Sequence, residues 1–265
     1  HLILATPDNG VAAAMYAACK ATVKVGDGNE ITLHEQTNYP FEETIRFTVN
    51  TPKAVSFPFY LRIPSWTEGA TIFVNGKKVA ANPEAGQYAC INREWKDNDQ
   101  VEIQLPMQLS MRTWQVNKNS VSVDYGPLTM SLKIDEDYVK KDSRATAIGD
   151  SKWQEGADAS QWPTYEIYAK TPWNYALVLG KNKPLKDFKV VHKEWPADNF
   201  PFTVASTPIE VKAIGRKVPS WVIDQYDLCS ELPDMDAPKG EKEEITLIPM
   251  GAARLRVSAF PNTRE

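Results

Sequence analysis

Paired carboxylates are the residues in this sequence that could most directly do chemistry, because two facing acidic side chains can cleave a glycosidic bond. Each candidate pair lies in turn-like surroundings, where acidic side chains more often bond the local backbone than a substrate. We interpret all of them as turn residues and assign no catalytic residue. The pairs are Glu42 with Glu43, Asp97 with Asp99, and Asp234 with Asp236.

The histidines form no constellation with a nucleophile. His34 and His192 lie within strand-like runs and His1 is terminal, so we interpret them as ordinary polar residues. A hydrolase elbow of the form GxSxG does not occur, and neither does a phosphate loop, a dinucleotide fingerprint or an EF-hand loop. The sequence therefore lacks an autonomous active-site signature.

The cysteines give no metal-binding motif. Cys19, Cys90 and Cys229 are far apart, without a CxxC pair or a histidine at ligand spacing, which argues against a zinc site built within this chain. We expect three buried thiols, no metal ligand and no cofactor held by this chain. The odd count leaves one disulfide open and the redox compartment undecided.

Eight tryptophans are many for this length. Trp66, Trp95 and Trp221 each stand at a strand end beside a turn. There an indole ring can fill one end of the core while its N–H donates a hydrogen bond to a carbonyl. Trp153 and Trp162 lie in an irregular polar segment instead, which makes them our candidates for carbohydrate contact.

The elements that would position these side chains are short strands. Segments with alternating or β-branched character recur at close spacing, while a helical period is almost absent, and this pattern is typical of antiparallel sandwiches. Asn75-Gly76 supplies the two positive-φ positions of a type I′ hairpin turn, and Asp97-Asn98-Asp99 predicts another tight turn. The segments include ATVKVG, EITLHEQ, TIRFTVN, FPFYLRIP, ATIFVNGKKV, YACINREW, DQVEIQLP and SVSVDYG.

The fold class we predict is all-β, with two consecutive antiparallel β-sandwich, jelly-roll-like domains. The first spans residues 1–135, a linker or long excursion spans 136–163, and the second spans 164–265. In the stretch GVAAAMYAACK, odd and even positions are both mainly apolar, which suits either an Ala-rich helix or a strand covered on both faces. If residues 2–19 form strands, apolar residues on both faces of these strands imply that a second layer covers the face turned away from the sandwich core.

Composition excludes several partners. A net charge of −4 with dispersed Lys and Arg provides no basic stripe for nucleic acid. No apolar run approaches the roughly 18 residues of a membrane helix, so we expect no membrane partner. The sequence begins at His1 with neither an initiator Met nor a signal peptide, and we expect it to be a piece of something longer.

Four short motifs in the first half carry a family resemblance: LRIPSW (61–66), VNG (74–76), REW (93–95) and GPL (126–128). With them, residues 1–134 resemble the C-terminal β-sandwich region of glycoside hydrolase family 127, the β-L-arabinofuranosidases and their bacterial relatives. Two residues depart from the family pattern: Tyr125 stands where Arg is usual, and Asn98 where Gly is usual. The second half is similar to an extra C-terminal module of a bacterial subgroup.

The resemblance implies that catalysis belongs to an upstream (α/α)6 barrel, with a cysteine thiolate as nucleophile and a zinc ion held by Cys and Glu. None of those residues is expected in this chain, and Cys19 receives no catalytic role. Arg62 is expected to form a charge-assisted bond across a sheet edge or to the barrel. The scaffold residues that we carry over are Arg62, Trp66, Asn75, Gly76, Trp95, Gly126 and Pro127.

We therefore expect this chain to be a non-catalytic portion of a glycoside hydrolase. It would brace its own catalytic domain and form one wall of the substrate cleft. One alternative is an independent carbohydrate-binding module, whose partner would be a plant or microbial polysaccharide. Another is a structural or adhesion sandwich with an exposed pairing edge. Retention in a polysaccharide affinity gel would favour the binding module.

Overall fold

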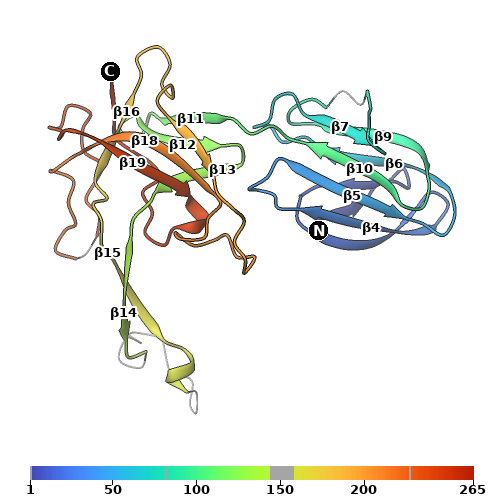
Figure 1. Cartoon of the computed structure of the whole chain (residues 1–265), viewed down its shortest axis with the longest axis horizontal. Helices are drawn as coiled ribbons and strands as arrows, with labels where there is room; N and C mark the ends of the chain where they lie inside the picture. Colours follow the sequence, from blue (N-terminus) through green and yellow to red (C-terminus); the bar gives the residue numbers. More distant parts are fainter. Residues whose placement is uncertain (1, 81–82, 144–157, 227) are drawn as a thin grey trace. The chain divides into compact units, whose positions relative to one another are not determined.

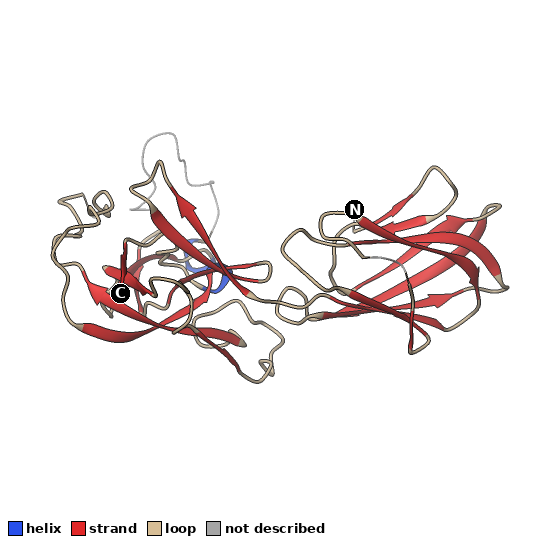
Figure 2. Ribbon diagram, turned by 90° about the horizontal axis from the view of Figure 1, so that it is seen from above, coloured by secondary structure: helices blue, strands red, loops and turns tan. Residues whose placement is uncertain are grey.

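The computed structural model describes residues 2–80, 83–143, 158–226 and 228–265. Strands dominate this part of the chain (Figure 2), and its helical elements are the short 3-10 turns η1 (Ala159–Gln161) and η2 (Met250–Ala252). The all-β prediction is confirmed. No helix within the described ranges has the length and apolar character needed to cross a bilayer.

The chain forms two compact units. The first comprises His1–Ser110 with Asp124–Leu128, and the second comprises Met111–Val123 with Thr129–Glu265. This division falls upstream of the boundary expected after residue 135. The reason is long-range pairing, since Met130 to Leu132 pair with residues near 249 and so belong to the second unit's sheet.

The first unit is a sandwich of two sheets (Figure 1). Sheet A has the order β1 (Ile3–Ala5), β2 (Val11–Ala13), β6 (Val55–Arg62) and β9 (Tyr88–Trp95). Sheet B has the order β3 (Cys19–Val25), β4 (Asn29–Thr37), β5 (Thr44–Asn50), β10 (Asp99–Gln104), β7 (Thr71–Val74) and β8 (Lys77–Lys78).

The core of this sandwich follows from period-two alternation. On β5, Ile45, Phe47 and Val49 are buried while the residues between them face outward. On β6, Phe57, Phe59 and Leu61 point inward from the opposite sheet. Phe47 meets Phe59 edge to face across the sandwich, with ring centroids 5.3 Å apart.

The N-terminal stretch resolves as strands rather than a helix. Strand β2 lies between β1 and β6, and all three of its residues are buried. Val11 and Ala13 belong to the core between the sheets, whereas Ala12 lies on the outer face of sheet A. Leu4 and Met15 are the exposed large hydrophobic side chains among residues 2–19.

The second unit is built on one eight-stranded sheet with the order β11 (Leu109–Trp114), β12 (Ser120–Tyr125), β13 (Leu128–Leu132), β19 (Lys242–Pro249), β18 (Ile209–Lys217), β16 (Tyr175–Leu179) and β20 (Asn262–Arg264). Strand β17 (Lys189–His192) also pairs with β18. A bridge between Val121 and Phe260 links strand β12 to the residues before β20, so the sheet curls back on itself.

The first residues of the expected linker pair with the residues just after it as a two-stranded ribbon. Strands β14 (Glu136–Lys141) and β15 (Thr164–Ala169) pair along their full lengths, and Figure 1 shows them running away from the eight-stranded sheet. The segment between them includes residues 144–157, which lie outside the described residues.

Candidate functional site

Carboxylates of the candidate pairs form hydrogen bonds and ion pairs with other groups of the protein. Glu42 accepts a bond from the Asn38 amide at 2.8 Å, and Glu43 accepts the Met107 N–H at 2.7 Å. Asp234 pairs with Lys118 at 3.1 Å on the surface of the second unit. Glu42 bonds within its own turn, whereas Glu43 and Asp234 contact residues that are distant in sequence.

Asp97 and Asp99 hold the turn between β9 and β10. Asp97 accepts the N–H of Thr51 at 3.1 Å, while Asp99 accepts the Asn75 amide at 2.7 Å and the Lys96 N–H at 2.9 Å. Burial alone would raise the pKa of Asp99, but the hydrogen bonds outweigh it and the pKa is lowered. Asp99 is thus a fixed anion that braces two turns.

Two of the predicted core tryptophans are buried with a bonded ring N–H. Trp95 is fully buried and donates to the Phe57 carbonyl at 3.0 Å, and Trp221 donates to the Ser230 carbonyl at 3.1 Å. Trp66 is half-buried and packs against the core of the first unit. Trp95 and Trp221 are therefore buried as a core role requires, whereas Trp66 is only half-buried.

The other scaffold residues also lie at turns. Asn75 and Gly76 have φ values of 49° and 75°, as a type I′ turn requires, and Asn98 has φ 63°. Gly126 has φ 55° and precedes Pro127 in the turn between β12 and β13. The positive φ of Asn98 explains why Asn can replace Gly there.

Arg62 does not make the bond across a sheet edge that we expected. It ends strand β6 with an exposed side chain, and its guanidinium forms no ion pair with any carboxylate in the described ranges. Its carbonyl instead accepts the hydroxyl of Tyr16 at 2.6 Å. The bond to a catalytic domain remains a proposal.

Of the two carbohydrate-contact candidates, Trp153 lies outside the described residues. Trp162 is 68% exposed, and its carbonyl accepts a hydrogen bond from Ser143. It stands two residues before β15, whose Tyr165 packs edge to face on Tyr138 with centroids 6.1 Å apart. The ribbon therefore presents several exposed aromatic rings.

The prediction of three buried thiols is wrong. Cys90 and Cys229 are exposed, Cys19 is half-buried, and all three are free. Cys90 has the outward parity on β9, since Ala89 and Ile91 on either side of it face the core. Parity within the strand, rather than the general preference of cysteine for burial, decides its environment.

Glu35 is a buried acid that our sequence reasoning missed. It is 1% exposed and accepts the Ala17 N–H at 3.0 Å and the Cys19 thiol at 3.6 Å. Burial raises its pKa to about 7, although those two bonds oppose the rise. Its inward position could have been found, because Glu35 shares the parity of Ile31 and Leu33 on β4.

This acid does not form a metal site. Among the residues that the structure describes, no group of three or more His, Cys, Asp or Glu side chains is placed to hold a metal ion. Burial and the nearby Glu35 raise the pKa of Cys19, so that its thiol stays protonated and can donate to the carboxyl group. The family resemblance implies a zinc ion in an upstream barrel, and the described residues offer no set of ligands for it.

The outer face of sheet A carries exposed and partly exposed apolar and aromatic side chains. Strand pairing aligns Leu4, Ala12 and Tyr60 in one row across β1, β2 and β6. Leu4 is 42% and Tyr88 48% exposed, and Tyr60 and Tyr88 line a shallow hollow of about 530 Å³. We call this row with Tyr88 the tyrosine face.

A polar group at the edge of the tyrosine face fixes its central ring. The Tyr60 hydroxyl donates to the Asp8 carboxylate at 2.6 Å. This bond raises the pKa of Tyr60, and bonds from Thr6 and Tyr60 lower the pKa of Asp8. An apolar centre with a polar rim is the usual composition of a protein interface.

Comparison with known proteins locates a family domain in the first unit. Residues 10–107 match the family described as β-L-arabinofuranosidase, GH127 middle domain. No curated protein sequence matches the chain.

Solved structures share the fold of both units. A GH127 β-L-arabinofuranosidase from Geobacillus stearothermophilus T6 aligns with 99% of the chain at 21% identity and a TM-score of 0.62. A glycoside hydrolase aligns with 97% at 22% identity and a TM-score of 0.60, and a GH127 β-arabinofuranosidase with 97% at 20% identity and a TM-score of 0.61.

The chain covers only 35% of the first of these structures and 36% of the other two. It thus spans about a third of their length. The resemblance predicted for residues 1–134 is confirmed: over residues 10–107 the chain matches the middle domain of the GH127 β-L-arabinofuranosidases, a family of glycoside hydrolases.

Proposed function

We propose that this chain is the non-catalytic β-sandwich portion of a glycoside hydrolase of the family 127 type, which acts on L-arabinofuranoside-type substrates. The observation that carries the proposal is the match of residues 10–107 to that family's middle domain. Because the chain spans about a third of the solved relatives, catalysis would belong to another part of the full-length protein.

Within such a protein, the chain would brace the catalytic domain through the tyrosine face. Exposed apolar side chains on a sheet face lose contact with water when another domain covers them, at roughly 25 cal/mol for each Å² buried. Leu4, Tyr60 and Tyr88 provide this surface. In the same arrangement the sandwich would wall one side of the substrate cleft.

The structural or adhesion alternative has less support. Its expected feature is an open pairing edge, and the edge strand β3 of sheet B exposes Lys20 and Lys24. Charged lysines on an edge strand discourage pairing with another chain.

Substitutions on the tyrosine face test the brace. We expect Leu4→Ser and Tyr88→Ser to lower the melting temperature of the full-length protein, each costing about 1–3 kcal/mol of buried apolar contact. The 265-residue chain alone should be nearly unaffected, because both side chains are already exposed in it.

Val116→Ser is the matched control, since Val116 is fully exposed in the second unit. It should change neither melting temperature. If the face variants melt like the wild type in the full-length protein, the tyrosine face does not dock the catalytic domain.

A further inference from the structure

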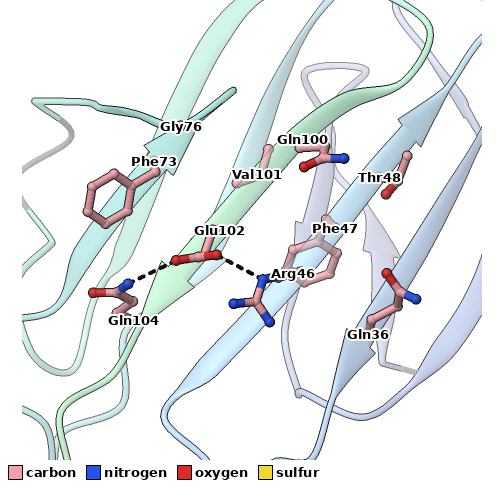
Figure 3. Close-up of a pocket in the computed structure, with 10 residues that line it drawn as sticks. All are labelled: Gln36, Arg46, Phe47, Thr48, Phe73, Gly76, Gln100, Val101, Glu102 and Gln104. Atoms are coloured by element: carbon pink, nitrogen blue, oxygen red, sulfur yellow. Dashed lines mark hydrogen bonds and ion pairs between the residues drawn. The ribbon is translucent and has the colours of Figure 1, made fainter.

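A second surface of the first unit has the features of a binding site. The outer face of sheet B contains a hollow of about 380 Å³, built from strands β4, β5, β10 and β7 (Figure 3). Its floor is the sheet itself. Three amides line it, together with one hydroxyl, one guanidinium, one carboxylate and one aromatic ring. They are Gln36, Arg46, Thr48, Phe73, Gln100, Glu102 and Gln104.

Strand register aligns these groups in a row. Gln36 is opposite Arg46, Arg46 is opposite Glu102, and Glu102 is opposite Phe73. With strands spaced roughly 4.8 Å apart, the row spans roughly 14 Å across the sheet, which is the length of a short oligosaccharide. Thr48 and Gln100 form a parallel row beside it.

The centre of the row is held in place before any ligand arrives. Glu102 accepts the Arg46 Nε–H at 2.9 Å and the Gln104 amide at 2.8 Å, as Figure 3 shows. Gln104 is fixed in turn by Thr71, whose hydroxyl lies 3.3 Å from its amide oxygen. Preorganised polar groups lose little conformational entropy when they bind a ligand.

Other groups in the hollow are available for a ligand. The side-chain amides of Gln36 and Gln100 make no hydrogen bond within the described residues, and Arg46 uses only its Nε on Glu102. Its side chain is 61% exposed. The charges of Arg46 and Glu102 cancel, so the hollow favours a neutral ligand that both donates and accepts hydrogen bonds.

We propose that this hollow binds a neutral oligosaccharide lying along the row from Gln36 to Phe73. Sugar hydroxyls donate and accept hydrogen bonds, which planar amide, guanidinium and carboxylate groups satisfy in pairs. The half-buried Phe73 ring at the end of the row gives the apolar C–H face of a sugar a surface to stack on. This function is additional to the brace, because the hollow lies on sheet B and the tyrosine face on sheet A.

Affinity gel electrophoresis of the 265-residue chain tests the proposal, with branched arabinan, arabinogalactan, xylan and mixed-linkage β-glucan as probes. We expect at least one neutral polysaccharide to retard the chain. Gln36→Ala and Phe73→Ala should each weaken retention at least tenfold. Gln36→Ala changes an exposed side chain, so its effect does not depend on whether Phe73→Ala folds well.

Matched controls lie outside the hollow. Gln87→Ala removes another exposed amide and Tyr226→Ala an exposed ring of the second unit, and both should be retained like the wild type. Retention by none of the neutral polysaccharides would overturn the proposal. So would unchanged retention of Gln36→Ala, or stronger retention by polygalacturonate than by the neutral probes.

Failure of this test would leave the brace standing, since the brace depends on substitutions at Leu4 and Tyr88 in the full-length protein. Conversely, an unchanged melting temperature of the full-length Leu4 and Tyr88 variants would contradict the brace but would not bear on glycan binding by the hollow. The two proposals are therefore decided by different variants and different measurements.

Discussion

The carboxyl group of Glu35 lies where its charged form is poorly solvated. Within the described ranges, its donors are the Ala17 N–H and the Cys19 thiol, and burial raises its pKa to about 7. A folded-state pKa above that of the unfolded chain means that the folded protein binds an extra proton between about pH 4.5 and 7. Stability is then greatest below this window and falls as pH rises through it.

We therefore expect the free energy of unfolding to fall by up to about 3 kcal/mol between pH 4.5 and 8 because of Glu35. Glu35→Gln keeps an acceptor for the Ala17 N–H but cannot ionise, so this variant should lose that part of the pH dependence. Urea unfolding at pH 5 and pH 8 measures the difference.

Glu30→Gln on the same strand is the control, because Glu30 is exposed. It should retain the wild-type pH profile. Identical profiles for the wild type and Glu35→Gln would show that the buried carboxyl group does not set the pH dependence.

At the scale of elements, two glycine turns differ in one respect. Gly76 and Gly126 both have positive φ, which any other residue adopts at a cost. A Cβ on Gly76 would meet no atom within 4 Å, whereas one on Gly126 would lie 2.6 Å from Cγ of Met107. The first turn needs glycine for backbone conformation alone, and the second also needs it for space.

We expect Gly76→Ala to destabilise the first unit by about 1 kcal/mol through backbone strain. Gly126→Ala should cost about 1–3 kcal/mol more, because Met107 must move to admit the methyl group. Denaturant unfolding of the two variants compares them directly. Equal losses would mean that the Met107 contact relaxes without cost.

At the scale of the whole molecule, the chain matches the family's middle domain over residues 10–107 and spans about a third of the length of the solved relatives. Cys19, the thiol with an acidic neighbour, has a raised pKa rather than the lowered one of a nucleophile.

We therefore expect the 265-residue chain alone to release no aglycone from aryl L-arabinofuranosides, with or without added zinc. A chromogenic assay on the purified chain measures this. Cys19→Ala serves as the control for any background activity. Turnover that requires zinc and disappears in Cys19→Ala would overturn the assignment of catalysis to another part of the protein.

The sequence by itself determined what depends on near neighbours. Alternation in Thr44–Asn50 predicts a strand with one buried face, and Asn75-Gly76 predicts its turn, because side-chain parity and positive φ are local properties. The motifs around LRIPSW likewise carried the family resemblance that the comparison confirmed.

Only the tertiary structure decided which strands meet. The pairing of Met130 with Pro249 draws β13 into the second unit, and the alignment of Gln36, Arg46 and Glu102 creates the hollow. Parity places Glu35 on the inward face, but its near-complete burial depends on the loop that carries Ala17. Pairings between distant segments depend on packing of the whole chain, and no local pattern encodes them.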